Sequence, residues 1–184
     1  MFGKVVTVFG AVAIAGAMTL GAQEKTVMVG GAAMYPSKDI IDNAVNSKDH
    51  TTLVAAVKAA GLVETLKGAG PFTVFAPTNA AFAKLPDGTV DTLLQPANKK
   101  TLGSVLTYHV VAGRHDAKSL MAKAREANGK AELKTVAGDS LYVVLKDNKL
   151  SLQDGKGMNA AITIADVVQS NGVIHVIDTV VMAK

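Results

Sequence analysis

The spacing of apolar residues changes along this chain, from a helical repeat in the first half to short β-type runs in the second. Leu53, Val57 and Ala60 recur at the spacing of one helix face, and Gly61 can end that helix. Similar patterns predict helices near residues 39–45, 52–60, 62–66, 78–82, 90–94 and 98–106. Thr78 or Asn79 is the expected N-cap of the helix that begins near residue 78.

The second half contains β-branched and aromatic runs separated by Gly, Asp and Asn turns. Strands are predicted at residues 108–111, 133–136, 140–145, 149–152, 161–168 and 173–182, together with an earlier strand at 72–75 and an exposed helix at 118–127. Asn171-Gly172 is expected to form a tight hairpin turn, because Asn and Gly tolerate positive φ. Helices followed by strands predict a single α+β domain with an antiparallel sheet.

Composition excludes several classes of protein. The chain has no Cys, so it forms no disulfide, thiolate metal site or Cys nucleophile. Its net charge of +4 comes from 19 basic and 15 acidic residues that are scattered, which does not favour a nucleic-acid partner. Aromatic residues make up only 4% and Trp is absent, so stacking platforms for bases or sugars are not expected. The 49% hydrophobic content is sufficient for a folded core.

The N-terminal segment is typical of a secretory signal peptide. Lys4 is followed by an uncharged, apolar run over residues 5–23, and small residues allow cleavage after Ala17 or after Ala22. An uncleaved membrane anchor is the alternative, but the run is rich in Ala and Gly and no basic cluster follows it. We predict a signal peptide at 1–22, a flexible linker at 23–36 and one domain at 37–184. The mature chain is then secreted, periplasmic or at the cell surface, without stable membrane insertion.

A search for catalytic and metal-binding patterns found no signature. The histidines do not stand at the i, i+2 or i, i+4 spacings that converge on a metal, and no Ser lies in Gly-x-Ser-x-Gly. The Gly-rich stretches at 30–31 and 68–70 lack the Lys-Ser/Thr ending of a phosphate loop, and the Asp spacing is not that of a calcium loop. The sequence therefore predicts no enzyme activity, no cofactor and no metal site.

Polar residues inside apolar runs are the remaining unusual feature. Strand alternation places Val173, His175 and Ile177 on one face, with Ile174, Val176 and Asp178 on the other. A polar group in such a run is expected to be buried with hydrogen-bond partners or to lie at a sheet edge. Tyr108 and His109 pose the same question, and on a strand their side chains would point to opposite faces. We expect the Tyr108 ring to be buried with its hydroxyl paired, and His109 to be hydrogen-bonded.

Three motifs resemble the signature blocks of the fasciclin (FAS1) family. Residues 70–82, Gly-Pro-Phe-Thr-Val-Phe-Ala-Pro-Thr-Asn-Ala-Ala-Phe, look like its first block. Residues 108–113, Tyr-His-Val-Val-Ala-Gly, are similar to its central Tyr-His motif, and residues 171–178, Asn-Gly-Val-Ile-His-Val-Ile-Asp, resemble its second block. The three occur in the family order, and the resemblance extends over about residues 37–182, nearly the whole mature chain. The resemblance implies a wedge of β-strands with several helices gathered at one side.

The resemblance also implies a secreted or surface-attached adhesion module and marks candidate binding residues. In animal members the Tyr-His region and an Asp-Ile pair are tied to integrin-dependent adhesion, and the matching positions here are Tyr108, His109, Asp166 and Val167. Asp166 is preceded by Ile164-Ala165 where the family usually has Asn-Lys, and this departure argues against integrin as the partner. The other motif residues are expected to be structural: Thr73, Pro77, Thr78, Asn79, Asn171, Gly172, His175 and Asp178.

Two functional classes follow for the mature domain. The leading hypothesis is a non-enzymatic extracytoplasmic adhesion or interaction module that binds a protein or polysaccharide partner. The alternative is a periplasmic protein that binds a small ligand in a cleft between sheet and helices. An exposed apolar patch with a polar rim favours the first class, and an enclosed apolar pocket favours the second. The pattern leaves the oligomeric state open.

Overall fold

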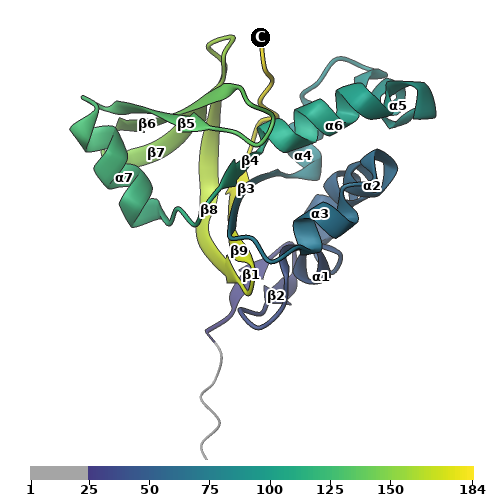
Figure 1. Ribbon diagram of the computed structural model, residues 1–184, viewed down its shortest axis with the longest axis horizontal. Helices are drawn as coiled ribbons and strands as arrows, with labels where there is room; N and C mark the ends of the chain where they lie inside the picture. The colour runs from purple at the N-terminus through teal and green to yellow at the C-terminus, as the bar shows by residue number, and fades with distance from the viewer. Residues whose placement is uncertain (1–24) are drawn as a thin grey trace, which may run out of the picture.

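The computed structural model describes residues 25–184, which form a long curved sheet flanked by helices (Figure 1). The predicted signal peptide at 1–22 lies outside the described residues. Seven strands pair in the order β4-β3-β9-β8-β7-β6-β5. Their bounds are β3 Phe72–Pro77, β4 Val110–Ala112, β5 Lys130–Lys134, β6 Ser140–Lys146, β7 Lys149–Gln153, β8 Asn159–Gln169 and β9 Gly172–Ile177. A separate hairpin pairs β1, Val27–Val29, with β2, Ala32–Met34.

Most helices lie on one side of the β3–β9 part of the sheet, and the last one covers the opposite side beside β5, β6 and β7 (Figure 1). The first group comprises α1 Ile40–Ala44, α2 Thr51–Ala60, α3 Val63–Lys67, α4 Asn79–Ala83, α5 Thr89–Leu94 and α6 Lys99–Tyr108, with short 3-10 turns η1 Lys48–His50 and η2 Pro96–Asn98. The last helix is α7, Ala117–Glu126. The expected α+β fold with helices gathered at one side is confirmed, and α7 is the helix on the other side.

Local sequence signals explain where several helices begin. The Asp39 carboxylate caps α1 by accepting from the Asp42 amide at 2.8 Å, and the Thr78 hydroxyl caps α4 through the Ala81 amide at 3.2 Å. Asp116 caps α7 in the same way, at 2.7 Å from the Ser119 amide. Of the two predicted caps for α4, Thr78 is therefore the one used.

The sheet departs from a purely antiparallel arrangement at one pair of neighbouring strands, β3 and β9. β3 and β9 run parallel, from Phe72 opposite Gly172 to Pro77 opposite Ile177, whereas every other pair in this sheet is antiparallel. At the far end, an isolated bridge between Val111 and Thr135 brings β4 back towards β5. The Val136 amide also donates to the Val110 carbonyl at 2.8 Å, so the sheet is nearly closed on itself.

Strands β3 and β9 separate two hydrophobic cores. Val74, Ala76, Ile174 and Val176 face the core beneath α1–α6. Phe75 and Ile177 face a second core, which α7 and strands β5–β8 complete. Because β3 and β9 are buried on both faces, they carry near-continuous apolar runs rather than a polar–apolar alternation.

Two sequence-based predictions of local structure are wrong. Residues 27–34 form the β1–β2 hairpin, where a flexible linker over 23–36 was predicted, and Val29 and Met34 of this hairpin are buried in the helical core. Residues 108–111 are not one strand. Tyr108 ends α6 and His109 is the C-cap of that helix, so β4 begins only at Val110.

The predicted turn at Asn171-Gly172 is present, but for a different physical reason. β8 and β9 pair as an antiparallel hairpin with Gln169 opposite Gly172, as expected. Neither Asn171 nor Gly172 is among the positive-φ residues of the described chain. Gly172 is required because a Cβ there would overlap the Phe72 carbonyl oxygen of β3 and press on the Ile40 side chain. Close approach between strands, rather than backbone conformation, fixes this glycine.

Candidate functional site

Tyr108 and His109 are buried at the end of α6, where the helix passes into β4. The side chain of Tyr108 is 0% exposed, and its hydroxyl donates to the Ser140 carbonyl at 2.8 Å and accepts from the Gly155 amide at 3.1 Å. Tyr108 thus connects α6 to the start of β6 and to the loop after β7. The expectation of a buried ring with a paired hydroxyl is confirmed.

His109 is held in one neutral tautomer by two backbone groups. Its Nδ1 lies 2.8 Å from the Val105 carbonyl and therefore carries the proton, while its Nε2 accepts from the Val181 amide at 3.2 Å. The ring is 2% exposed. Burial lowers the pKa of His109 to about 4, although the Val105 carbonyl opposes this shift. The imidazole is neutral at physiological pH, and the expected hydrogen bonding is confirmed.

His175 is also a buried histidine, and it lies beside Phe75 of the second core. It is 0% exposed and stacks on Phe75, the residue opposite it on β3, with ring centroids 5.6 Å apart. Its Nε2 donates to the His115 carbonyl at 2.8 Å, and its Nδ1 accepts from the Asp166 amide at 3.3 Å. Burial lowers the pKa of His175, with the His115 carbonyl and nearby Asp carboxylates opposing the shift. The prediction that this polar residue is buried and hydrogen-bonded is confirmed.

Asp166 and Val167 lie at an irregularity in β8, where the pairing with β9 shifts between Ile164 and Val167. Asp166 has a φ of 58° there, a left-handed conformation that Asp tolerates better than most residues. Its exposed carboxylate accepts from the Ala117 amide at 2.6 Å and so fixes the start of α7. Val167 is only 1% exposed. Of the four predicted binding residues, Asp166 alone reaches the surface, and its side chain already has an internal partner.

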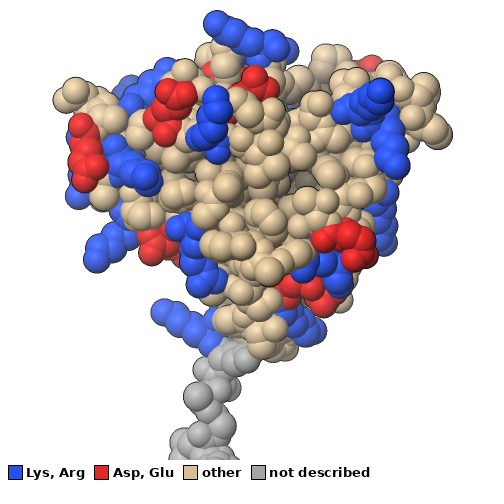
Figure 2. All heavy atoms as spheres, viewed as in Figure 1, with Lys and Arg blue, Asp and Glu red and all other residues tan. Residues whose placement is uncertain are grey.

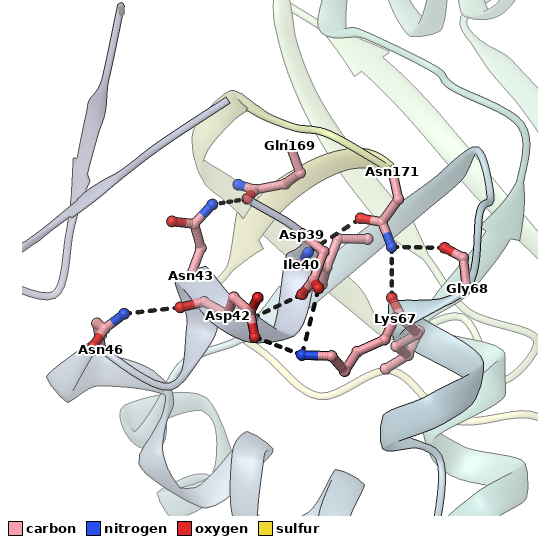
Figure 3. A network of polar contacts seen from close by, with 10 residues as sticks. Asp39, Ile40, Asp42, Asn43, Asn46, Lys67, Gly68, Gln169 and Asn171 are labelled. Atoms are coloured by element: carbon pink, nitrogen blue, oxygen red, sulfur yellow. Dashed lines mark hydrogen bonds and ion pairs between the residues drawn. The ribbon is translucent and has the colours of Figure 1, made fainter. Parts of the chain in front are cut away.

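Asn171 joins three elements at the end of the β8–β9 hairpin (Figure 3). Its side-chain oxygen accepts from the Ile40 amide at 3.1 Å, and its side-chain nitrogen donates to the carbonyls of Leu66 and Gly68 at 2.7 and 2.9 Å. The amide therefore satisfies the first turn of α1 and the end of α3 together. Beside it, the Asn43 side chain donates to that of Gln169, which ties α1 to β8 as well.

Three more motif residues, Thr73, Pro77 and Asn79, are either buried or hydrogen-bonded to other parts of the domain. The Thr73 hydroxyl donates to the Gly113 carbonyl at 2.7 Å and accepts from the His115 amide at 2.8 Å. Pro77 is the buried last residue of β3. The Asn79 side chain accepts from the Thr52 amide and donates to the Lys48 carbonyl and the Thr51 hydroxyl, so it secures the start of α2.

Asp178 follows β9 and is half-buried beneath α4 and β8. Its Oδ1 accepts from the Ala161 amide at 2.8 Å and from the Thr179 hydroxyl at 3.0 Å, and its Oδ2 lies 3.4 Å from the Lys84 ammonium. Burial alone would raise the pKa of Asp178, but these donors together hold it below the usual value.

Sequence reasoning missed an exposed apolar surface at the hairpin end of the molecule. We call this the hairpin-end surface, and it comprises Met28, Tyr35, Val45 and Val168, which are 60%, 41%, 47% and 40% exposed. They come from β1, the end of β2, the end of α1 and β8, which meet at this end (Figure 1). The side chain of Lys38 lies over the Tyr35 ring at 5.0 Å and forms part of a polar rim. The hairpin that presents Met28 was hidden because residues 30–33 are small and resemble a linker.

An apolar cavity lies between the helices and the sheet, where the alternative hypothesis of a small-ligand protein placed its cleft. It has a volume of about 60 Å³ and is lined by side chains of α1, α2, α3, α6 and of β3, β4 and β9.

Across the middle of the face in Figure 2, the described residues place no charged side chain. Within residues 25–184, no cluster of three or more His, Cys, Asp or Glu has a metal-binding arrangement. Likewise, no helix among these residues has the length and hydropathy of a membrane span.

Comparison with solved structures identifies the fold class. The chain superposes on a FAS1 domain pair from the insect cell adhesion molecule Fasciclin I with a TM-score of 0.72, covering 80% of this chain and 52% of that one at 19% identity. The family model described as Fasciclin domain matches residues 48–183. The chain therefore belongs to the fasciclin (FAS1) family, as its motifs indicated.

Relatives in three groups of organisms share the domain. Protein sll1483 of Synechocystis is 46% identical over 159 residues, covering 86% of this chain and 81% of that protein. Immunogenic protein MPB70 of Mycobacterium bovis is 38% identical over 144 residues, covering 76% of this chain and 66% of that protein. Transforming growth factor-beta-induced protein ig-h3 of Sus scrofa is 36% identical over 145 residues, which cover 79% of this chain but 19% of that longer protein.

Proposed function

We propose that this chain is a non-enzymatic, extracytoplasmic interaction module that binds a protein partner through its hairpin-end surface. The observation that carries the proposal is the clustering of exposed apolar side chains. Four of the six large apolar residues that are exposed among residues 25–184 come from β1, the end of β2, the end of α1 and β8, which meet at one end of the molecule. Scattered single apolar residues need no explanation, whereas several together with a polar rim are typical of contact sites.

The buried motif residues support a surface away from the Tyr-His motif. A partner that docked on Tyr108, His109 or Val167 would have to displace the side chains that cover them, because each is at most 2% exposed. These residues instead hold the helices and strands in place. We expect the partner to contact exposed side chains on those elements, at the hairpin-end surface. Binding through exposed side chains agrees with the name of the insect relative, a cell adhesion molecule, although that likeness carries only the fold.

Aliphatic chemistry favours a protein over a polysaccharide as the partner. Met28, Val45 and Val168 offer flexible or branched apolar contacts, and Tyr35 is the one aromatic ring of the surface. Protein interfaces are enriched in Met and Tyr, whereas sugar rings are bound chiefly by stacking on aromatic side chains. The surface therefore suits an apolar patch on another envelope or matrix protein.

The proposed location depends on the signal peptide at residues 1–22. Mass spectrometry of the natively produced protein should find an N-terminus between Met18 and Lys25. Recovery of intact Met1 from a soluble fraction would contradict the extracytoplasmic assignment. This measurement is independent of whether the hairpin-end surface binds a partner.

Matched surface variants test the contact. The double variant Met28→Ser, Val168→Thr removes apolar area from the hairpin-end surface. The control variant Val136→Thr, Met158→Ser changes the same residue types at the two exposed positions outside it. Both should fold as the parent does, because surface changes away from special features cost about 0.5 kcal/mol or less each.

Adhesion to envelope or matrix preparations of the producing cell is the readout. We expect the hairpin-end variant to lose at least ~10-fold in apparent affinity, while the control binds as the parent does. Equal binding by all three proteins would refute the assignment of this surface. Loss of binding only on Tyr108→Phe, in protein that is still folded, would return the site to the Tyr-His motif.

A further inference from the structure

The apolar cavity is built almost entirely from side chains that cannot form hydrogen bonds. Met34, Ile41 and Val57 line it from the helical side, and Val74, Val110 and Ile174 line it from the sheet. No Lys, Arg, Asp or Glu is among its lining residues. An empty space of this kind forfeits the dispersion contacts that its walls would otherwise make, so an apolar molecule of the right shape gains by filling it.

Among the polar residues that line this cavity, His50 is the one with a buried side-chain atom that lacks a hydrogen-bond partner. The residue lines the cavity at the end of η1 and is 3% exposed. Its Nδ1 lies 2.9 Å from the Ser47 hydroxyl, but its Nε2 is the one buried side-chain nitrogen or oxygen among the described residues without a hydrogen-bond partner. Burial also lowers the pKa of His50, and the nearby Ala76 backbone, which makes no hydrogen bond of normal geometry to Nε2, opposes that shift in part.

A buried polar atom without a partner is uncommon and unfavourable in native proteins. All other buried histidine nitrogens in the described chain have partners, including both of His109 and both of His175. The exception lies at the wall of the apolar cavity between the helices and the sheet. A ligand with one hydrogen-bonding group would give Nε2 of His50 a partner, and the apolar walls of the cavity would pack against the rest of the ligand.

We propose that this cavity is a binding site for a neutral, unbranched aliphatic alcohol, with the hydroxyl hydrogen-bonded to Nε2 of His50. A hydroxyl both donates and accepts, so it can pair with Nε2 whichever tautomer the Ser47 hydroxyl selects. A carboxylate does not fit, because no lining cation would compensate its burial. The volume of about 60 Å³ is well below the ~150 Å³ of an engineered cavity that binds benzene, which favours a thin chain over a ring.

The rim of the cavity lets the chain length vary. Thr65 of α3 and Val136 after β5 line the cavity and are exposed, and Thr107 of α6 is half-buried beside them. A short alcohol would be enclosed, whereas the end of a longer alkyl chain could leave between these residues. The site rests on the cavity and His50 alone, so it stands or fails separately from the proposed protein contact.

Solution NMR of the folded protein with 1-pentanol and 1-chloropentane tests the proposal. Both probes have an apolar five-carbon chain, but only the alcohol can hydrogen-bond to His50. We expect saturable shift changes at the methyl groups of Leu53, Val57 and Ile174, and at the His50 ring with the alcohol only. The alcohol should bind ~5- to 10-fold more tightly than the chloride. Absence of saturable changes with either probe overturns the proposal.

Two variants assign the interaction to its atoms. His50→Phe keeps an aromatic ring but removes both ring nitrogens, and should abolish the preference for the alcohol while the chloride still binds. Val57→Leu adds volume to the cavity wall and should weaken both probes at least ~10-fold. Val143→Ile enlarges a residue of the second core by the same amount and should leave binding unchanged. Unchanged affinity in Val57→Leu, or an unchanged preference in His50→Phe, would refute the site even where the parent binds both probes.

A series from 1-butanol to 1-decanol identifies the form of the natural ligand. Affinity that stops rising after about five carbons indicates a small enclosed alcohol. Affinity that continues to rise indicates the end of a longer chain that leaves past Thr65 and Val136. Affinity that rises equally in the parent and in Val57→Leu would show binding elsewhere and overturn the proposal.

Discussion

Acidification should destabilise this protein through His109 well before its carboxylates are protonated. The native pKa of His109 is about 4, against an ordinary value of 6.5 that the unfolded chain restores. Between pH 4 and pH 6.5, His109 is protonated in the unfolded state but neutral in the native state, because a proton on Nε2 would point at the Val181 amide. The contribution of His109 to stability is therefore complete above pH 6.5, and it is lost as the pH falls towards 4.

The magnitude follows from the two pKa values. Linkage of one proton between 6.5 and about 4 gives a loss of about 2 kcal/mol at pH 5 and about 3 kcal/mol at pH 4, relative to pH 7.5. The perturbation is His109→Gln, which keeps a donor and an acceptor but does not titrate. This variant should be less stable than the parent at pH 7.5, yet its stability should fall less steeply on acidification.

Urea unfolding followed by circular dichroism at pH 7.5, 6, 5 and 4 measures this difference. His115→Gln is the matched control: His115 is half-buried, and burial and the charge of Lys123 lower its pKa too. It should change the pH dependence less than His109→Gln does. Identical pH dependence in the parent and in His109→Gln would refute the reasoning, as would an NMR titration in which the His109 ring protonates near pH 6.5.

Three further substitutions test the buried motif by their effect on the urea midpoint. Gly172→Ala should cost more than about 2 kcal/mol, because the new Cβ meets backbone, and a neutral outcome would mean that β3 can move away. Tyr108→Phe should cost about 1–3 kcal/mol through two lost hydrogen bonds, and an unchanged midpoint would show that water replaces the hydroxyl. His175→Ala should cost about 2–4 kcal/mol, whereas a stable variant with lost adhesion would make His175 a contact residue.

Elements with strong local signals could be predicted from the sequence, and elements fixed by tertiary contact could not. The face of α2 and the capping of α4 by Thr78 depend on neighbours within a few positions, and the structure has both. Asn79 was considered for the same cap, but its side chain secures α2, more than 25 positions earlier, through the Thr52 amide. No local pattern reports a partner at that distance.

For Gly172 and His109 the predicted feature is present, but the structure gives a physical cause that the sequence pattern did not contain. The turn before Gly172 was expected from its sequence, but the requirement for glycine comes from β3, which no hairpin pattern includes. The hydrogen bonding of His109 was expected, yet the strand proposed for it was wrong, because α6 continues through Tyr108 and both side chains are buried. His50 carried no signal at all, since an orphaned nitrogen depends on the geometry of its surroundings.

The position of β9 between β3 and β8 has a consequence for how the chain folds. Its residues are among the last of the sequence, yet they lie between β3 and β8, and Asn171 beside them holds Ile40 across a separation of 131 positions. Pairing over such separations must close long loops before it gains stability, which slows folding. A nascent chain that ends before residue 171 lacks both the β9 partner of β3, which is left with β4 alone, and the Asn171 side chain that anchors α1. The helical core can therefore be completed only after β9 has been synthesised, and a chain truncated before β9 exposes the apolar faces of β3 and β8 together.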